Sequence, residues 1–239
     1  MLRREGQPVK TAMLVVFSGM DGAGKTTQIG SLEEYLLSRK IRTYRAWARG
    51  GYTPIFEFLK RLLRRVAGRR LGSAGQSVQR ERAMARPTIA RLWLRVALLD
   101  LILFWCVYLR LLGLLGRTVI CDRYIDDTRL DFRRNFPTVA FEEMWLWRLL
   151  ERVVPTPDAA FLLWVPVEES LRRSKEKGEP FPDDEDTLTW RLEAYLDNSL
   201  YPPDRYVRLD GRRAVSELTE AIISTVGERL GKSARVSFP

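Results

Sequence analysis

The sequence predicts a three-layer α/β fold, in which a parallel sheet of about five strands carries helices on both faces. Two observations lead to this prediction. Short apolar runs of the kind that form buried parallel strands alternate along the chain with longer segments of helical periodicity. The chain is also 239 residues long, which suffices for a full hydrophobic core. We therefore expect residues 1–239 to form a single domain.

The expected elements follow one another in a regular order. The strands are predicted at 13–17, 41–47, 117–121, 159–165 and 206–209. A helix is expected directly after the first strand, and further helices at 55–66, 92–115, 141–153, 168–177, 187–200 and 215–230. Residues 1–11 and 231–239 are expected to be tails.

A phosphate-binding motif follows the first expected strand. Gly19, Gly24, Lys25 and Thr26 have the spacing G-x-x-x-x-G-K-[ST]. The glycines let several backbone N–H groups turn toward a triphosphate, and a helix that begins near Gly24 adds its positive end. Lys25 is suited to the β- and γ-phosphates, and the Thr26 hydroxyl to Mg²⁺. The residues expected to bind the nucleotide are Gly19, Asp21, Gly22, Ala23, Gly24, Lys25, Thr26 and Thr27.

Composition narrows the chemistry further. The formal net charge of +10 favours anionic partners such as phosphates, nucleic acid or an anionic membrane surface. The chain has no histidine, which excludes a Ser-His-Asp triad and histidine metal sites. Its two cysteines, Cys106 and Cys121, lie in apolar runs, so we expect reduced thiols in the cytoplasm.

A basic stretch at 60–95 and an apolar stretch at 92–115 leave two interpretations open. Arg95, Asp100 and Arg110 interrupt the apolar stretch, and its longest uncharged part falls far short of the roughly 20 residues that span a bilayer. A core helix is the first interpretation, and a helix that also makes a peripheral membrane contact is the alternative. Nucleic acid is not expected as a partner, because basic and aromatic residues do not interleave.

The motifs together resemble the thymidylate kinases, a branch of the nucleoside monophosphate kinases, from about residue 12 to about residue 228. Residues 17–28 look like the phosphate loop of that family, with its acidic residue at Asp21. Gly50-Gly51 with Thr53-Pro54-Ile55 is similar to the family's Glu-Pro-Gly-Gly-Thr-Pro-Ile turn. Further matches are Asp122-Arg123-Tyr124 after a strand, Pro157-Asp158 before a strand, Arg173, Lys177 and Gly178 before the lid, and Asp210 after the last strand.

This resemblance implies a P-loop kinase fold with a short lid at about 173–187. It implies ATP- and Mg²⁺-dependent transfer of a phosphoryl group to a nucleoside monophosphate, most simply dTMP. Thr26 and Asp122 would hold Mg²⁺, Arg123 would bridge donor and acceptor phosphates, and Asp21 would contact the acceptor sugar. Arg173 and Lys177 would close over the transferring group. The expected catalytic residues are Lys25, Asp122, Arg123, Arg173 and Lys177.

The acceptor side departs from the family pattern. Trp47 replaces an arginine, so that Arg45 or Arg49 would contact the acceptor phosphate, and Leu101 replaces the arginine that reads thymine. The residues expected on the acceptor side are Asp21, Arg49, Asp100, Arg123, Asp127 and Asp131. Because the groups that would select thymine are missing, a sugar or lipid-linked acceptor at a membrane surface is an alternative. A nucleotide-dependent regulatory protein without kinase activity is a third hypothesis, and a homodimer is also left open.

Overall fold

The computed structural model describes residues 12–47, 53, 87–178 and 183–235. The chain divides into two compact units. The first comprises Met1–Ala46, Leu111–Asp126 and Thr156–Pro239, and the second comprises Trp47–Arg110 and Asp127–Pro155. The predictions for Arg49, for the helix at 55–66 and for the middle of the lid lie outside the described residues.

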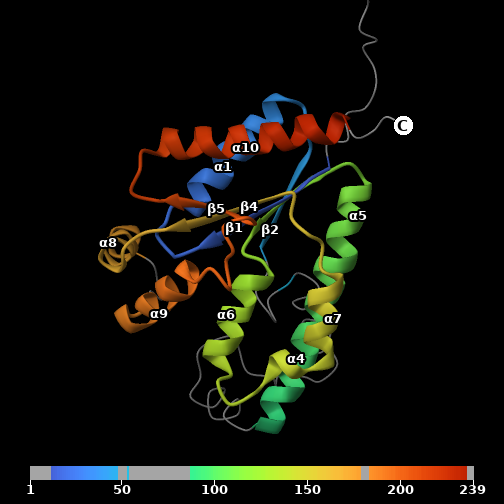
Figure 1. Cartoon of the computed structure of the whole chain (residues 1–239), viewed down its shortest axis with the longest axis vertical. Helices are drawn as coiled ribbons and strands as arrows, with labels where there is room; N and C mark the ends of the chain where they lie inside the picture. The colour runs from blue at the N-terminus through green and yellow to red at the C-terminus, as the bar shows by residue number, and fades with distance from the viewer. Residues whose placement is uncertain (1–11, 48–52, 54–86, 179–182, 236–239) are drawn as a thin grey trace, which may run out of the picture. The chain divides into compact units, whose positions relative to one another are not determined.

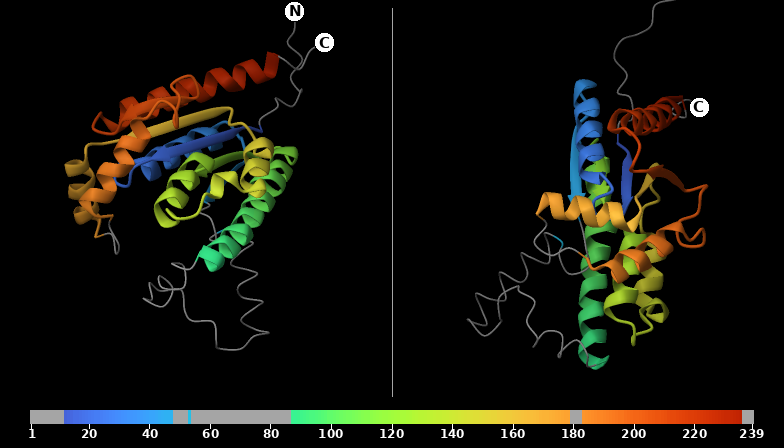
Figure 2. Two further views of the ribbon diagram at one scale, coloured as in Figure 1. Left: turned by 60° about the horizontal axis from the view of Figure 1, so that its bottom comes forward. Right: turned by 90° about the vertical axis from the view of Figure 1, so that its left-hand side faces the viewer.

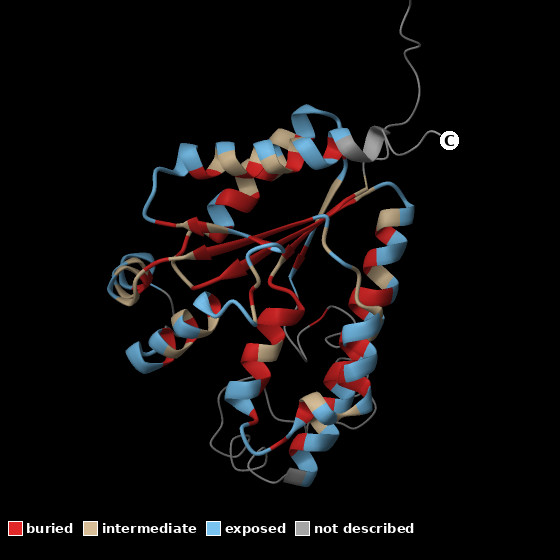
Figure 3. Cartoon of the chain, viewed as in Figure 1, coloured by how far each residue is buried: buried red, intermediate tan, exposed pale blue. Residues whose placement is uncertain are grey.

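The first unit is built on a five-stranded sheet, as the sequence predicts. In chain order the strands are β1 (Leu14–Gly19), β2 (Thr43–Trp47), β3 (Thr118–Asp122), β4 (Ala159–Trp164) and β5 (Tyr206–Asp210). Their order in the sheet is β2-β3-β1-β4-β5. Strand β1 pairs in parallel with β3 and β4, and β4 pairs in parallel with β5. β1, β3 and β4 are buried almost throughout, which explains why each reads as a continuous apolar run (Figure 3).

Helices cover this sheet on both faces. Helices α1 (Lys25–Ser38) and α10 (Val215–Arg235) pack against each other on one face. Helix α8 (Val167–Lys177) lies near the carboxyl end of β4, and α9 (Glu185–Leu196) lies on the face of the sheet opposite α1 and α10 (Figures 1 and 2). The predicted three-layer α/β fold is confirmed. Each predicted strand is present, with its ends shifted by at most two residues.

The second unit is helical. Helix α4 (Pro87–Leu101) continues through a π-helical stretch η2 (Ile102–Tyr108) into α5 (Leu109–Leu114), which belongs to the first unit from Leu111 on. Helix α6 (Ile125–Asn135) belongs to the second unit from Asp127 on, and a 3₁₀ turn η3 (Phe141–Glu143) and α7 (Trp145–Val153) follow it. Five aromatic rings pack into one cluster, with ring centroids 4.9–6.3 Å apart: Trp93, Phe132, Phe136, Phe141 and Trp147. Helix α6 was not predicted, because its many charged residues hide the apolar positions.

The long helix at 88–114 confirms the predicted element at 92–115 and extends it toward the N-terminus. Its 27 residues are long and apolar enough to cross a membrane by length and composition, and half of the most apolar window is buried within the protein. A buried core helix passes the same criterion, so this is weak evidence for a membrane span. The result is compatible with the core helix that the sequence predicts.

Candidate active site

The phosphate loop joins β1 to α1, and its glycines adopt backbone conformations that other residues avoid. Gly19, Gly22 and Gly24 have φ angles of 128°, 74° and 92°. At Gly19 a Cβ would lie 1.9 Å from the carbonyl oxygen of Leu163 on β4, so a side chain cannot fit there. The close approach of β1 and β4 therefore fixes where the loop begins.

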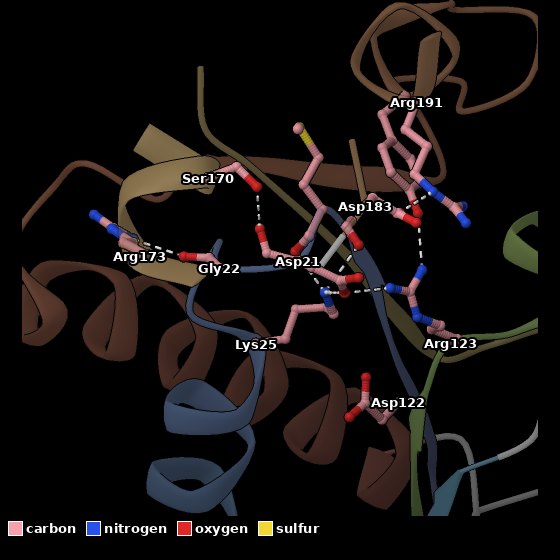
Figure 4. A network of polar contacts seen from close by, with 12 residues as sticks. Asp21, Gly22, Lys25, Asp122, Arg123, Ser170, Arg173, Asp183 and Arg191 are labelled. Carbon is pink, nitrogen blue, oxygen red and sulfur yellow. Dashed lines mark hydrogen bonds and ion pairs between the residues drawn. The ribbon is translucent and has the colours of Figure 1, made fainter. Parts of the chain in front are cut away.

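Lys25 lies at the start of α1 and is only 8% exposed. Its Nζ donates to the carbonyl oxygens of Gly19, at 2.9 Å, and Met20, at 2.6 Å, and lies 3.8 Å from the Asp21 carboxylate (Figure 4). In this described part of the chain, no side chain caps the helix at Gly24 and no acidic residue lies in its first turn. The positive end of α1 is therefore open to an anionic ligand beside a buried ammonium group.

Asp122 and Arg123 lie where β3 ends beside β1. Asp122 is in register with Phe17, and the Arg123 N–H donates to the Phe17 carbonyl oxygen at 2.8 Å. Arg123 has a φ of 76°, and its guanidinium donates to the Asp21 carboxylate at 2.6 Å. The first unit thus gathers Lys25, Asp21, Asp122 and Arg123 at the carboxyl edge of the sheet, where ligands bind in such folds (Figure 4).

Arg45, on β2, joins this edge. Its guanidinium lies 3.4 Å from the Asp122 carboxylate. The sequence offered Arg45 or Arg49 as the contact to the acceptor phosphate. The structure places Arg45 beside Asp122, while Arg49 lies outside the described residues.

The predicted magnesium ligands supply suitable atoms. Thr26 offers an exposed hydroxyl at the first turn of α1, and Asp122 offers a carboxylate at the end of β3. Within the described ranges, no group of three or more acidic, cysteine or histidine residues could hold a metal by itself. Mg²⁺ is commonly held by one or two protein oxygens together with phosphate oxygens and water. The two residues therefore fit a nucleotide-dependent magnesium site, and not an all-protein cage.

Arg173, predicted as a lid cation, anchors the phosphate loop in this structure. Its guanidinium donates to the carbonyl oxygens of Gly22 and Gly211, each at 3.0 Å, and to the Glu169 carboxylate at 2.6 Å. Hydrogen bonds from Arg172 and Arg173 lower the pKa of Glu169 to about 2. These contacts tie α8 to the loop and to the turn after β5.

One contact of Asp21 and one of Arg123 were not predicted from the sequence. Ser170, fully buried on α8, donates to the Asp21 carbonyl oxygen at 2.8 Å. Tyr195, fully buried on α9, accepts a hydrogen bond from Arg123 at 3.1 Å. Neither residue type carries a motif by itself, so only the fold could reveal them. Lys177, the other predicted lid cation, is exposed at the last position of α8.

The remaining predicted acceptor residues are buried in the second unit. Asp100 is 5% exposed and accepts a hydrogen bond from the hydroxyl of Thr53. Asp127 and Asp131 are 1% and 8% exposed and lie one turn apart on α6. Buried carboxylates are costly unless they are satisfied, so these positions are specific features of the fold. Their predicted contact with an acceptor stays a prediction.

Comparisons with known proteins indicate the family that the chain resembles. No protein-family model matches the chain. Thymidylate kinases of Chlorobium luteolum and Chlorobium chlorochromatii are each 27% identical to it, over 91% of this chain and 98% and 96% of theirs. A thymidylate kinase of Rhodopseudomonas palustris is 27% identical over 92% of this chain and 91% of its own. The chain is thymidylate kinase-like. The likeness covers nearly the full length of both sequences.

Proposed function

We propose that this thymidylate kinase-like chain is an ATP- and Mg²⁺-dependent phosphotransferase that phosphorylates a nucleoside monophosphate, with dTMP as the first candidate. The observation that carries the proposal is the arrangement of Lys25, at the open positive end of α1, with Asp122 and Arg123 at the adjacent strand end. Such an arrangement suits phosphoryl transfer, which depends on positioning and charge neutralisation. The full-length likeness to thymidylate kinases supports the same reaction class.

Each residue has a role that its surroundings support. The loop N–H groups and Lys25 would bind the donor phosphates, and Thr26 and Asp122 would hold Mg²⁺, which supplies charge neutralisation at those phosphates. Arg123 would contact the transferring group, because its guanidinium already lies within 2.6 Å of the loop carboxylate Asp21. We assign Arg173 to holding the loop, and Lys177 to the lid. The acceptor is itself a phosphate, so the reaction requires no general base.

A coupled assay of ADP release across the nucleoside monophosphates tests the reaction and identifies the acceptor. We expect turnover with at least one of them, and dTMP is the first to try. Lys25→Ala should lower kcat at least about 100-fold, because the ammonium group contacts the charge of the transferring phosphate. Lys40→Ala, which changes an exposed lysine just beyond the end of α1, is the matched control. No turnover of the wild-type protein with any nucleoside monophosphate would reject the proposal.

A second candidate keeps the chemistry and places the acceptor at a membrane. It is favoured by the exposed side of α4 and η2, where large apolar side chains repeat every three or four residues and are 36–61% exposed. They are Ile89, Leu92, Val96, Leu99, Leu103 and Val107. The exposed charges on these elements and at Arg110 are all arginines, whereas the acidic Asp100 is buried. An apolar stripe flanked only by positive charge suits an anionic lipid surface.

Flotation with vesicles tests this second candidate. We expect binding to vesicles that contain about 30% anionic lipid, weaker binding at high salt, and loss of binding in the double variant L99E/L103E. The substitutions lie on the exposed side, so the fold should persist by circular dichroism. Failure to bind at low salt would remove the support for a membrane acceptor. A dimer mass in solution that becomes a monomer mass in L99E/L103E would instead assign the stripe to a homodimer.

A further inference from the structure

A ring of side-chain contacts in the first unit begins and ends at the start of α6. Arg123 donates to the Tyr195 hydroxyl at 3.1 Å, and the Tyr195 ring packs on Tyr201 with centroids 5.1 Å apart. Tyr201 packs on Tyr206 at 5.0 Å, and the Tyr206 hydroxyl donates to the Asp126 carboxylate at 2.5 Å. Asp126 follows Arg123 by three residues, so the chain itself closes the ring.

The ring is sealed from solvent. Its three tyrosines are at most 1% exposed, and Asp126 and Arg123 are 4% and 5% exposed. Hydrogen bonds to charged groups are stronger in such surroundings, and their loss leaves a buried charge with less compensation. Arg205 adds a second contact to the same carboxylate, at 3.4 Å, and its guanidinium also lies over the Tyr206 ring at 5.5 Å. Arg205 therefore contacts both members of the Tyr206–Asp126 pair and helps to hold them together.

The ring restrains Arg123. Its φ of 76° is unfavourable for a residue with a side chain, and such a conformation persists only where neighbouring contacts impose it. Its backbone N–H is held by Phe17, and its guanidinium is held by Asp21 on one side and Tyr195 on the other. The ring supplies the Tyr195 side of this clamp and also fixes the start of α6.

We propose that Tyr206 is a positioning residue for Arg123: it orients Tyr195 through the edge-to-face ring of Tyr201 and holds the start of α6 through Asp126. No motif marks Tyr206, which lies on β5 more than 80 residues beyond Arg123. The catalytic part of this inference rests on the proposed phosphoryl transfer, whereas the restraint on the Arg123 side chain does not. The sequence-distant tyrosine would therefore set how precisely the guanidinium meets the transferring phosphate.

Tyr206→Phe is the decisive variant, because it retains the ring contacts and removes only the hydroxyl. In the ligand-free protein, nitrogen-15 relaxation of the Arg123 Nε should show a mobile side chain in the variant and a restrained one in the wild type. With the acceptor identified by the ADP-release assay, kcat should fall about tenfold while the KM for ATP stays within about twofold. Both measurements are made well below the melting temperature of each protein. Tyr35→Phe, ten residues beyond Lys25 on α1, is the matched control and should change neither quantity.

Asp126→Asn is a second variant, which keeps the Tyr206 hydroxyl and changes the group that accepts its hydrogen bond. The amide oxygen can still accept from Tyr206, so Arg123 should stay more restrained in this variant than in Tyr206→Phe. If Arg123 is equally restrained in Tyr206→Phe and in the wild type, the inference is overturned, and it is equally overturned if Arg123 becomes mobile while kcat is unchanged. A wild-type protein that phosphorylates no acceptor rejects the proposed function, and the relaxation measurement still decides whether Tyr206 restrains Arg123.

Discussion

Replacing Arg173 with lysine separates two roles for this residue, an anchor beneath the phosphate loop and a cation above the transferring group. Lysine keeps the positive charge but cannot reach the Gly22 and Gly211 carbonyl oxygens and the Glu169 carboxylate at once, as the guanidinium does at 2.6–3.0 Å. A hydrogen bond to a charged group contributes about 1.5–3 kcal/mol when buried. Since the Arg173 side chain is 27% exposed, we take about 1 kcal/mol for each of the two carbonyl contacts.

The two contacts together contribute about 2 kcal/mol. If their loss weakens only the binding of ATP by the loop, the ATP affinity falls by at most about 30-fold. We therefore expect calorimetry to show ATP binding about 5- to 30-fold weaker in Arg173→Lys, with kcat at saturating ATP reduced less than about threefold. Arg172→Lys is the matched control, because Arg172 lies on the same helix and donates to the side chains of Glu169 and Glu176 rather than to the loop. Unchanged ATP affinity with a kcat reduced 100-fold would refute the anchor and restore the lid cation.

Three further predictions follow from the same site. Thr26→Ala should raise the Mg²⁺ concentration required for half-maximal ADP release about tenfold without lowering the melting temperature, because the hydroxyl is exposed; an unchanged requirement would remove Thr26 from the metal site. Gly19→Ala should destabilise the fold by about 3 kcal/mol or more in urea unfolding, since its Cβ would meet the Leu163 carbonyl oxygen at 1.9 Å; wild-type stability would contradict this geometry. Glu169→Gln should lower the free energy of unfolding at pH 7, and the difference from the wild type should shrink as the pH falls from 4.5 to about 2. The reason is that Arg172 and Arg173 hold the pKa of Glu169 at about 2 in the folded state, below its value in the unfolded chain. The ionised Glu169 therefore stabilises the folded protein above the unfolded pKa, and this stabilisation is lost as the carboxylate is protonated. A difference in unfolding free energy that does not depend on pH would show that the ion pairs do not contribute.

For the helix at 88–114, the sequence predicts the helix but only the structure shows which of its sides is buried. Its apolar residues predict a helix, but they do not say which side is buried, because apolar residues occur on both sides. The structure buries Leu94, Leu98 and Leu101 and exposes Leu99 and Leu103. The unpredicted helix α6 shows the opposite case, since its buried carboxylates Asp127 and Asp131 look like surface residues in the sequence. Packing against an aromatic cluster overrides the local pattern there.

The sequence by itself determined the parallel sheet, the phosphate loop and the residues that follow β3. Buried strands, glycines with positive φ and a lysine at a helix start are local requirements, so they leave a local pattern. The tertiary structure alone decided that Arg173 supports the loop and that Tyr206 belongs to the surroundings of Arg123. The Arg173–Gly22 and Tyr206–Asp126 contacts join residues 151 and 80 positions apart in the sequence, and no local pattern marks these side chains before the fold brings them together.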